Sequence, residues 1–460
     1  MSKRPLFMIR ATKCGALLCA LGACAPGEPP PNVLLISIDS LRPDHLGAYG
    51  YERATSPNID SLAAEGTLFE AAISTTTWTL PAHASMLTSL YPEVHGASQD
   101  GTRLSESAVL VSERLREDGY YTGAVVSAPY LHRDFGFDQG WDVYDDEPTI
   151  FERRTENANP SHWGVTSPTV HARAVDLIER ADGAPFFLFV HYWDVHYDYA
   201  PPPPYDTMFD PAYAGDVTSL NFEFNEAIHR RMNPRDLQQV VALYDGEIAH
   251  TDAYVGKLFA ELKARGLWTN TMVVLTADHG DEFFEHGQKG HRKNLFAPTL
   301  DVPIIIKLPG TSTPIPRVAI PVSLVDIVPT ILEAAALPAL EWSHGTSLLG
   351  LMDGSSTDGG FRFAALFDRL RVVVGGDLKL ISRWDLPAER GRQLSLYDLR
   401  RDPGERENLE AVREIARERL WAAQNQWLSV VEEQAGLLQR EALELDPEVA
   451  ERLRSLGYIR

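Results

Sequence analysis

Long apolar runs, separated by segments of helical periodicity, constrain the fold of this chain more than any other feature. Asn32–Ile38, Phe186–Val190 and Met272–Leu275 are almost continuously apolar, and Val302–Ile306 is a similar run. Such runs indicate strands buried on both faces, as in a parallel sheet covered by helices. Because strand and helix alternate through the first 340 residues, the sequence predicts an α/β fold with a mostly parallel sheet flanked by helices. A further strand is expected at Tyr121–Ser127, and helices at Ser56–Gly66, Leu80–Leu90, Ser105–Asp118, Pro168–Arg180 and Arg235–Arg265.

The pattern changes after residue 340, where short apolar runs are separated by turn signals such as Gly375-Gly376. This spacing predicts a small antiparallel subdomain over residues 341–410, after a main domain over residues 32–340. Residues 411–460 are expected to form C-terminal helices. The expected strands are Ala364–Phe367, Arg371–Val374, Leu378–Arg383 and Leu394–Leu399, and the expected helices are Leu409–Ala435 and Asp446–Leu456.

The N-terminus has the composition of an export signal. Four basic residues precede or flank the short apolar run Gly15–Ala23, and Leu21-Gly22-Ala23-Cys24 resembles a bacterial lipobox. Residues 1–24 are therefore interpreted as a lipoprotein signal peptide and residues 25–31 as a proline-rich tether. The prediction is an exported protein of the bacterial cell envelope, periplasmic or at the outer membrane, that contacts membrane only through a lipid on Cys24. The alternative is an ordinary secretory signal with an incidental cysteine.

Cysteine content and charge exclude several kinds of function. All three cysteines lie in the leader, so a processed chain has no disulfide and no thiol for catalysis or metal binding. The formal net charge of −22 argues against binding nucleic acid through a basic face. A small anionic substrate would need local compensation by a metal ion and a few basic side chains.

Acidic and imidazole side chains stand where the predicted strands end. Asp39 follows the first run, His191 the second, and Asp278 and His279 the third. Ligands of an open parallel sheet bind at the carboxyl ends of its strands, so these residues are expected to gather along one rim. Two carboxylates and an imidazole suit one divalent cation, and calcium, magnesium, manganese and zinc all remain possible. A single aspartate at a strand end is more often a cap or turn former.

Thr79 is the predicted nucleophile of this rim, and its oxygen is also a predicted metal ligand. A bound cation would lower the pKa of the hydroxyl, and the helix N-terminus would favour developing negative charge. The alternative, purely structural interpretation of Thr79 is a helix cap. His83 lies one turn further along and is expected to point at a bound anion. The remaining predicted catalytic residues, which would hold substrate oxygens or protonate the leaving group, are His191, His196, Lys289 and His291.

These segments resemble the sulfatase branch of the alkaline phosphatase superfamily, in the order found in that family. The matching blocks are TLPAHASMLTSLYP, GFDQGWDVYD, HYWDVHYDY, ADHG with EHGQKGH, VPIIIKLPG, LYDLRRDPGERENL and LRSLGYI. The resemblance implies an alkaline-phosphatase/sulfatase-like α/β domain with a small C-terminal antiparallel subdomain. It also implies one divalent metal at positions matching Asp39, Asp278 and His279, with the nucleophile at Thr79.

The departures from the family pattern concern the chemistry. Sulfate-cleaving members carry a cysteine or serine at the Thr79 position, oxidised to formylglycine, whose hydrate expels sulfate by re-forming the aldehyde. Threonine has no second hydroxyl for that step and is not a known substrate of the oxidation. Ser40 replaces an acidic metal ligand that is common in sulfatases. His279 stands where many sulfatases have asparagine and matches the phosphonate and phosphodiester hydrolases. His291 replaces a lysine that usually binds the sulfate group. The overall pattern of motifs therefore resembles that of a sulfatase, whereas the individual site residues favour phosphodiester chemistry.

The leading hypothesis is a metal-dependent hydrolase that cleaves a sulfate ester, phosphodiester or phosphonate ester outside the cytoplasm. Its substrate would be a small anionic ester or a sulfated or phosphorylated glycan or lipid. One alternative is a phospho-group transferase, although known enzymes of that kind usually have several membrane spans and none follows residue 24 here. The other is a catalytically inactive glycan-binding lipoprotein.

Overall fold

The computed structural model of the protein describes residues 29–149, 165–310, 315–386 and 393–436, together with 438, 441–443 and 450. The predicted signal peptide, Cys24 and most of the tether lie outside these residues, as does the predicted helix Asp446–Leu456 apart from Ala450. The described residues from Pro31 onward form one compact unit. The boundaries near residues 340 and 410 remain predictions. No helix of the described part has both the length and the apolarity to cross a lipid bilayer.

An eight-stranded sheet forms the centre of this unit. Every neighbouring pair is parallel except the two pairs made by one strand, β11, so the mostly parallel sheet predicted from the sequence is confirmed. In spatial order the strands are β12 (Arg317–Val318), β2 (Thr67–Phe69), β11 (Ile304–Lys307), β8 (Thr271–Ala277), β1 (Asn32–Ile38), β7 (Phe186–Tyr192), β5 (Tyr121–Val125) and β6 (Val143–Asp145).

The reversed strand β11 follows from its connection. The chain between β8 and β11 holds a short hairpin and the four-residue helix α7 (Ala297–Leu300). A parallel return needs a long crossover, usually a full helix, whereas this connection brings the chain back beside β8 in the opposite direction. The apolar run at Val302–Ile306 correctly predicted that this strand is buried. An apolar run does not indicate whether a strand is parallel or antiparallel to its neighbours.

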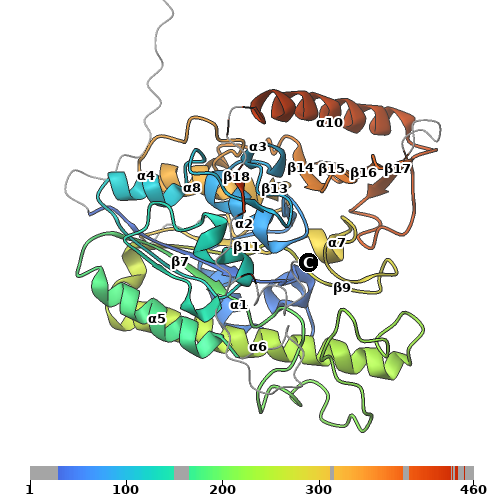
Figure 1. The fold of residues 1–460 in the computed structure, drawn as a ribbon, viewed down its shortest axis with the longest axis horizontal. Helices are drawn as coiled ribbons and strands as arrows, with labels where there is room; N and C mark the ends of the chain where they lie inside the picture. The colour runs from blue at the N-terminus through green and yellow to red at the C-terminus, as the bar shows by residue number, and fades with distance from the viewer. Residues whose placement is uncertain are drawn as a thin grey trace, which may run out of the picture. The chain divides into compact units, whose positions relative to one another are not determined.

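Helices cover both faces of the sheet, as Figure 1 shows. On one face, α5 (Ser167–Arg180) packs against α6 (Pro234–Ala264) and against strands β5 and β7. On the other face, α2 (Thr79–Thr88) packs between the sheet and α8 (Ile327–Ala334). The other helices are α1 (Pro57–Glu65), α3 (Pro92–His95), α4 (Val111–Glu117), α9 (Leu349–Met352) and α10 (Glu414–Gln434). The expected helix Ser105–Asp118 is correct only over α4, because Ser105 and its neighbours form turns before Leu110.

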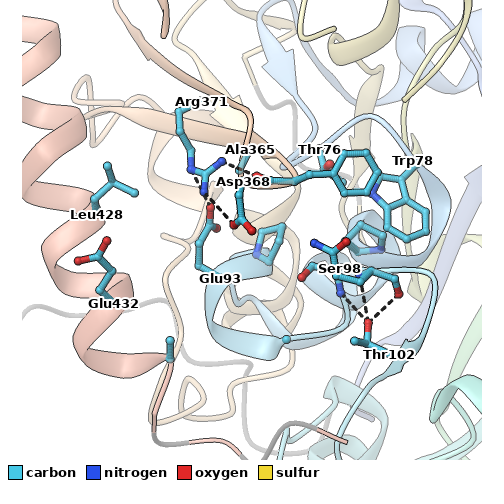
Figure 2. A pocket seen from close by; sticks show the side chains of 16 residues that line it. Thr76, Trp78, Glu93, Ser98, Thr102, Ala365, Asp368, Arg371, Leu428 and Glu432 are labelled. Carbon is cyan, nitrogen blue, oxygen red and sulfur yellow. Dashed lines mark hydrogen bonds and ion pairs between the residues drawn. The ribbon is translucent and has the colours of Figure 1, made fainter. Parts of the chain in front are cut away.

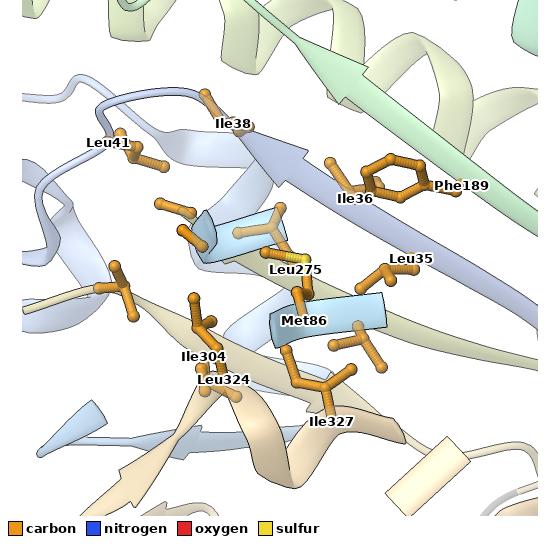
Figure 3. Close-up of a cluster of buried hydrophobic side chains, with 14 of the residues drawn as sticks. Leu35, Ile36, Ile38, Leu41, Met86, Phe189, Leu275, Ile304, Leu324 and Ile327 are labelled. Atoms are coloured by element: carbon orange, nitrogen blue, oxygen red, sulfur yellow. The ribbon is translucent and has the colours of Figure 1, made fainter. Parts of the chain in front are cut away.

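The core on the α2 side is mostly apolar. Figure 3 shows Met86 of α2 between sheet residues, including Leu35 and Leu275, and Ile327 of α8. These side chains are completely buried. Every residue of α2 is buried as well, which explains why its sequence contains no Asp, Glu, Lys or Arg. The helix therefore packs against the central strands, and its first turns lie near their carboxyl ends.

A second, four-stranded antiparallel sheet follows, as the turn signals predicted. Its strands are β14 (Arg362–Leu366), β15 (Leu370–Gly375), β16 (Leu378–Arg383) and β17 (Gln393–Asp398), joined in sequence order. Helix α10 packs on β15 and β16. The remaining short strands are β3 (Ala72–Ile73) with β13 (Val322–Ser323), β4 (Thr102–Arg103) with β18 (Glu441–Ala442), and β9 (Glu282–Phe283) with β10 (Lys289–Gly290).

Candidate functional site

The carboxyl ends of the three central strands bring the predicted rim residues together. Asp39 follows β1 and Asp278 follows β8, and these strands are neighbours with Ile38 opposite Ala277. His191 lies near the end of β7, on the other side of β1, opposite Ser37. All three rim side chains are completely buried. The two aspartates thus lie side by side because two parallel strands end at the same level.

The ligand atoms of Asp39, Asp278 and His279 lie within 4.8 Å of one another. His279 Nε2 is 3.3 Å from Asp278 Oδ2 and 3.9 Å from Asp39 Oδ1. His191 Nε2 approaches from the other side, 3.5 Å from Asp39 Oδ2. We call these four residues the carboxylate cluster.

The carboxylate cluster has the features of a cation site. Asp39 Oδ2, Asp278 Oδ2, His191 Nε2 and His279 Nε2 are buried and have no hydrogen-bond partner among the described residues. Buried polar atoms without partners are costly, and here four of them face one another. Carboxylate oxygens and imidazole nitrogens are ligands that divalent metals use, so the residues present fit the expected ion.

Ser40 holds the two carboxylates in place. Its backbone N–H donates to Asp278 Oδ1 at 3.2 Å, and its hydroxyl donates to Asp39 Oδ1 at 2.9 Å. The residue has a φ of 56°, in the left-handed region that serine rarely adopts. This conformation aims the N–H of Ser40 at the neighbouring strand's aspartate. Ser40 thus orients the two carboxylates from the position that, by the resemblance, holds an acidic ligand in many sulfatases.

Thr79 is the first residue of α2 and is only 3% exposed. The interaction of its hydroxyl with the Asp39 carboxylate slightly lowers the pKa of that carboxyl, so the predicted nucleophile adjoins the carboxylate cluster. His83, one turn further, hydrogen-bonds through Nδ1 to the Thr79 carbonyl and through Nε2 to Ser37 Oγ, each at 2.9 Å. Both ring nitrogens of His83 are thus engaged within the protein, and it lies 3.7 Å from Asp278 Oδ2. The structure places it behind the cluster.

A tight hairpin supplies the opposite side of the site. Strands β9 and β10 pair with Gly290 opposite Glu282, which brings Asp281 and His291 together across ten residues of chain. His291 Nδ1 lies 2.7 Å from Asp281 Oδ1, and the Tyr199 hydroxyl donates to Asp281 Oδ2 at 2.7 Å. The ring of His291 is 4.2 Å from that of His279, centroid to centroid. The hairpin therefore extends the cluster by an aspartate and a histidine.

The other predicted residues occupy different positions. His196 is buried, stacks on Trp193 and lies 5.2 Å from His291 between ring centroids. Lys289 donates through Nζ to the carbonyls of Asn225 and Ile228, so its ammonium ties the irregular segment after β7 to the hairpin. Its predicted contact with substrate stays a prediction.

Burial dominates the electrostatics of the site. It raises the pKa of Asp39 to about 7, against the smaller lowering effect of His279, and it also raises the pKa values of Asp278 and Asp281. Burial lowers the pKa of His191 to about 4, which keeps this imidazole neutral. For His279, burial lowers the pKa, but the nearby carboxylates together raise it above its ordinary value. Three buried carboxylates therefore share a region that a cation would stabilise.

A separate cavity of about 470 Å³ borders the segment that precedes Thr79. Its lining includes Trp78, Pro81, Glu93, Arg371 and Glu432. Figure 2 shows the Arg371 guanidinium directed at Glu93, 3.3 Å away. Among the described residues, none of those predicted for the active site lines this cavity. It lies beside the carboxylate cluster and not within it.

Sequence reasoning missed three contributors to the site: Ser40 as a positioning residue, Asp281, and Tyr199. The motif DHGD and the glycines at 287 and 290 were a usable signal for Asp281, because they indicate a turn that folds the chain back on itself. No local pattern marks Tyr199, which reaches Asp281 from 82 residues away.

Comparison with known proteins agrees with this fold. The Sulfatase family model matches residues 31–337. An arylsulfatase of Clostridium perfringens is 25% identical, over 82% of this chain and 90% of that protein. The multifunctional alkaline phosphatase superfamily protein PehA of Trinickia caryophylli is 26% identical, over 71% of this chain and 78% of that protein.

Solved structures share the fold. The phosphonate monoester hydrolase of Agrobacterium radiobacter superposes with a TM-score of 0.69 at 22% identity, covering 91% of this chain and 98% of that one. BT4656, solved with its substrate D-glucosamine-2-N,6-O-disulfate, gives a TM-score of 0.71 at 18% identity, covering 89% of this chain and 98% of that one. Because the family model matches residues 31–337, most of this chain, the chain belongs to the sulfatase family of ester hydrolases.

Proposed function

We propose that this protein is a metal-dependent ester hydrolase that attacks its substrate through Thr79 and prefers phosphodiesters or phosphonate monoesters to sulfate esters. The observation that carries the proposal is the Thr79 hydroxyl at the start of α2, next to the Asp39 carboxylate of the carboxylate cluster. The relatives include an arylsulfatase, and a solved structural neighbour is a phosphonate monoester hydrolase, so both ester classes are reasonable substrates.

Asp39, Asp278 and His279 are the residues proposed to hold the cation, with His191 beside them. When bound, the ion would act as a Lewis acid that lowers the pKa of a hydroxyl and offsets charge on the ester oxygens. We propose that Thr79 Oγ bonds to phosphorus while the bond to the leaving alcohol breaks. The N-terminal N–H groups of α2 favour the charge that develops there. Water then cleaves the threonine ester and restores the hydroxyl.

The preference for phosphorus follows from the nucleophile. Formylglycine hydrate can expel sulfate through its second hydroxyl, and threonine has no such group. A threonine ester must instead be cleaved by water at the central atom, as phosphatases do at phosphorus. We assign His196 and His291, on the hairpin side of the site, to stabilising the leaving oxygen. We further propose that the protein is exported and anchored through Cys24.

The test is a parallel assay of the purified protein on an aryl sulfate, a phosphate diester and a phosphonate monoester, with a divalent metal supplied. We expect faster turnover of the phosphorus esters. Thr79→Ala should lower kcat by about 10³-fold or more, whereas Thr79→Ser should keep measurable activity because the hydroxyl remains.

Thr88→Ala is the matched control, since it removes a hydroxyl from the other end of α2, where Thr88 bonds to the Ala84 carbonyl. It should leave turnover nearly unchanged. Aryl-sulfate turnover that exceeds phosphorus-ester turnover and survives Thr79→Ala would overturn the proposal, because attack would then come from water.

A further inference from the structure

A completely buried ion pair lies where the small antiparallel sheet meets the main domain. Lys379 of β16 and Glu405, in the loop after β17, lie 2.7 Å apart between Nζ and Oε1, and their side chains are 1% and 0% exposed. Removing two charges from water is costly, and well-packed apolar residues often stabilise a fold as well as a buried ion pair does. A stabilising effect alone therefore does not account for the pair.

The second carboxylate oxygen of Glu405 connects the pair to helix α7. Glu405 Oε2 accepts a hydrogen bond from the N–H of Ala297 at 2.6 Å. Ala297 is the first residue of α7, and the N–H groups at the start of a helix have no partner within it. At the other end of α7, burial raises the pKa of Asp301 to about 7, and the nearby charge of Lys379 lowers it. The pair thus binds one end of α7 and acts electrostatically on the other.

Helix α7 in turn packs against the chain segment that carries His279. The N–H of Gly280 donates to the Thr299 carbonyl of α7 at 3.0 Å. A Cβ at Gly280 would lie 2.3 Å from the Pro298 carbonyl oxygen, so the two segments meet backbone to backbone with no space between them. The Gly280 carbonyl lies 3.2 Å from His279 Nδ1, while His279 Nε2 belongs to the carboxylate cluster. The position of α7 therefore fixes the carbonyl that orients the His279 ring.

We propose that Glu405, held by Lys379, is a positioning residue for the carboxylate cluster. Glu405 fixes α7, α7 fixes the backbone at Gly280, and Gly280 sets the ring of His279. Groups that orient a metal-binding histidine change metal affinity by about 10–100-fold when they are altered. The coupling is reciprocal, so a cation bound at the cluster also strengthens the contact between Glu405 and α7. The inference rests on the proposed function, because it concerns the cation of that site.

The experiment measures the affinity of the purified full chain for Mn²⁺, with free ion followed by electron paramagnetic resonance. Two double variants remove both charges of the pair. Lys379→Met with Glu405→Gln keeps an amide oxygen that accepts from Ala297, so its Kd should stay close to that of the wild type. Lys379→Met with Glu405→Met has no acceptor, and its Kd should rise about 10-fold. A difference between the two variants isolates the contact with α7 from the loss of charge.

A second ion pair between the small sheet and the main domain provides the control. Arg371 of β15 lies 3.3 Å from Glu93, but this pair reaches α3 instead of α7. Arg371→Met with Glu93→Gln should therefore leave the Kd for Mn²⁺ unchanged. Urea unfolding of every variant in the presence of chelator measures general damage to the fold. A purely structural role of Glu405 would change this stability and leave the Kd as it is.

Equal Kd values for the wild type and both folded variants of the Lys379–Glu405 pair would overturn the inference. Hydrogen exchange of the wild type decides the matter even where a variant does not fold. Bound Mn²⁺ should slow amide exchange in α7 and in residues 402–409, as well as beside the ligands. Protection confined to residues 278–281 would overturn the inference.

Failure of the proposed function gives different results. A wild type that binds no Mn²⁺ and gains no protection overturns both the cation site and the inference. If Thr79→Ala keeps full turnover, the proposed nucleophile is wrong, whatever the Kd values of the Glu405 variants.

Discussion

Ser40 shows how a single residue shapes this site. Its left-handed backbone conformation directs one N–H to Asp278 while its hydroxyl reaches Asp39, so one residue orients the carboxylates that follow two strands. Non-glycine residues in this conformation carry strain of about 1 kcal/mol or more, and such strain is retained where the surroundings impose it. The sequence predicted that Asp39, Asp278 and His279 lie together because each follows a strand at the centre of the sheet. It could not reveal Ser40, because backbone angles leave no periodic signal.

Two substitutions of Ser40 distinguish the energetic effect of its backbone strain from that of its side-chain hydrogen bond. Ser40→Ala keeps the strained φ and loses the hydroxyl, whereas Ser40→Gly loses the hydroxyl but relieves the strain. We expect the alanine variant to be less stable than the glycine variant by about 1 kcal/mol in urea unfolding. Both should bind metal about 10-fold more weakly, since each loses a group that orients a ligand. Equal stability of the two variants would show that the backbone is not strained.

At the scale of elements, the sequence specified strands and long helices well and their junctions less well. Strand β1 and helices α5 and α6 agree with the predicted ranges within a residue or two, because burial and helical periodicity extend over whole elements. The reversed direction of β11, the short α4 and the β9–β10 hairpin depend on connections and tertiary contacts. Asp281 was missed for that reason: its partners lie across a hairpin and in a distant segment.

The junction of α2 and α3 contains a buried histidine with a predictable effect on stability. His95 Nε2 lies 3.2 Å from Ser85 Oγ of α2, and burial lowers the pKa of His95 to about 3 from an ordinary value of 6.5. The folded protein thus keeps the ring neutral, while the unfolded chain binds a proton below pH 6.5. Stability should therefore fall as the pH drops from about 6.5 toward 3.

His95→Gln removes the titrating group while keeping a polar side chain. The difference in unfolding free energy between wild type and variant should shrink by about 2 kcal/mol between pH 7 and pH 5. Denaturant unfolding at both pH values measures this difference and cancels the contributions of the other histidines. A difference that does not change with pH would mean that His95 is protonated as readily in the fold as in the unfolded chain.

For the molecule as a whole, the buried carboxylates should make the free energy of unfolding depend on the concentration of divalent metal. A cation that binds only the folded state adds about 2.7 kcal/mol when its concentration is 100 times Kd. We expect chelation to lower Tm by several degrees and added Mn²⁺ or Zn²⁺ to restore it. The Asp39→Asn variant should lose most of this metal-dependent shift. A wild-type Tm that is indifferent to chelator and metal would contradict a cation site in the carboxylate cluster.

Export is a property of the whole molecule that the leader residues predict. We propose that Cys24 carries a lipid that anchors the processed protein. Cys24→Ala should shift the protein from the membrane fraction to the soluble extract or leave its leader uncleaved, as followed by fractionation and intact mass. Unchanged membrane association of a Cys24→Ala protein would contradict the anchor.

The most direct test of the central claim, attack by Thr79, is the stereochemical course at phosphorus. A phosphorothioate diester that is chiral at phosphorus would be hydrolysed in heavy-oxygen water and the configuration of the product determined. Attack by Thr79 followed by attack of water inverts phosphorus twice, so the account predicts net retention of configuration. Net inversion would show a single direct attack by water and would contradict Thr79 as the nucleophile.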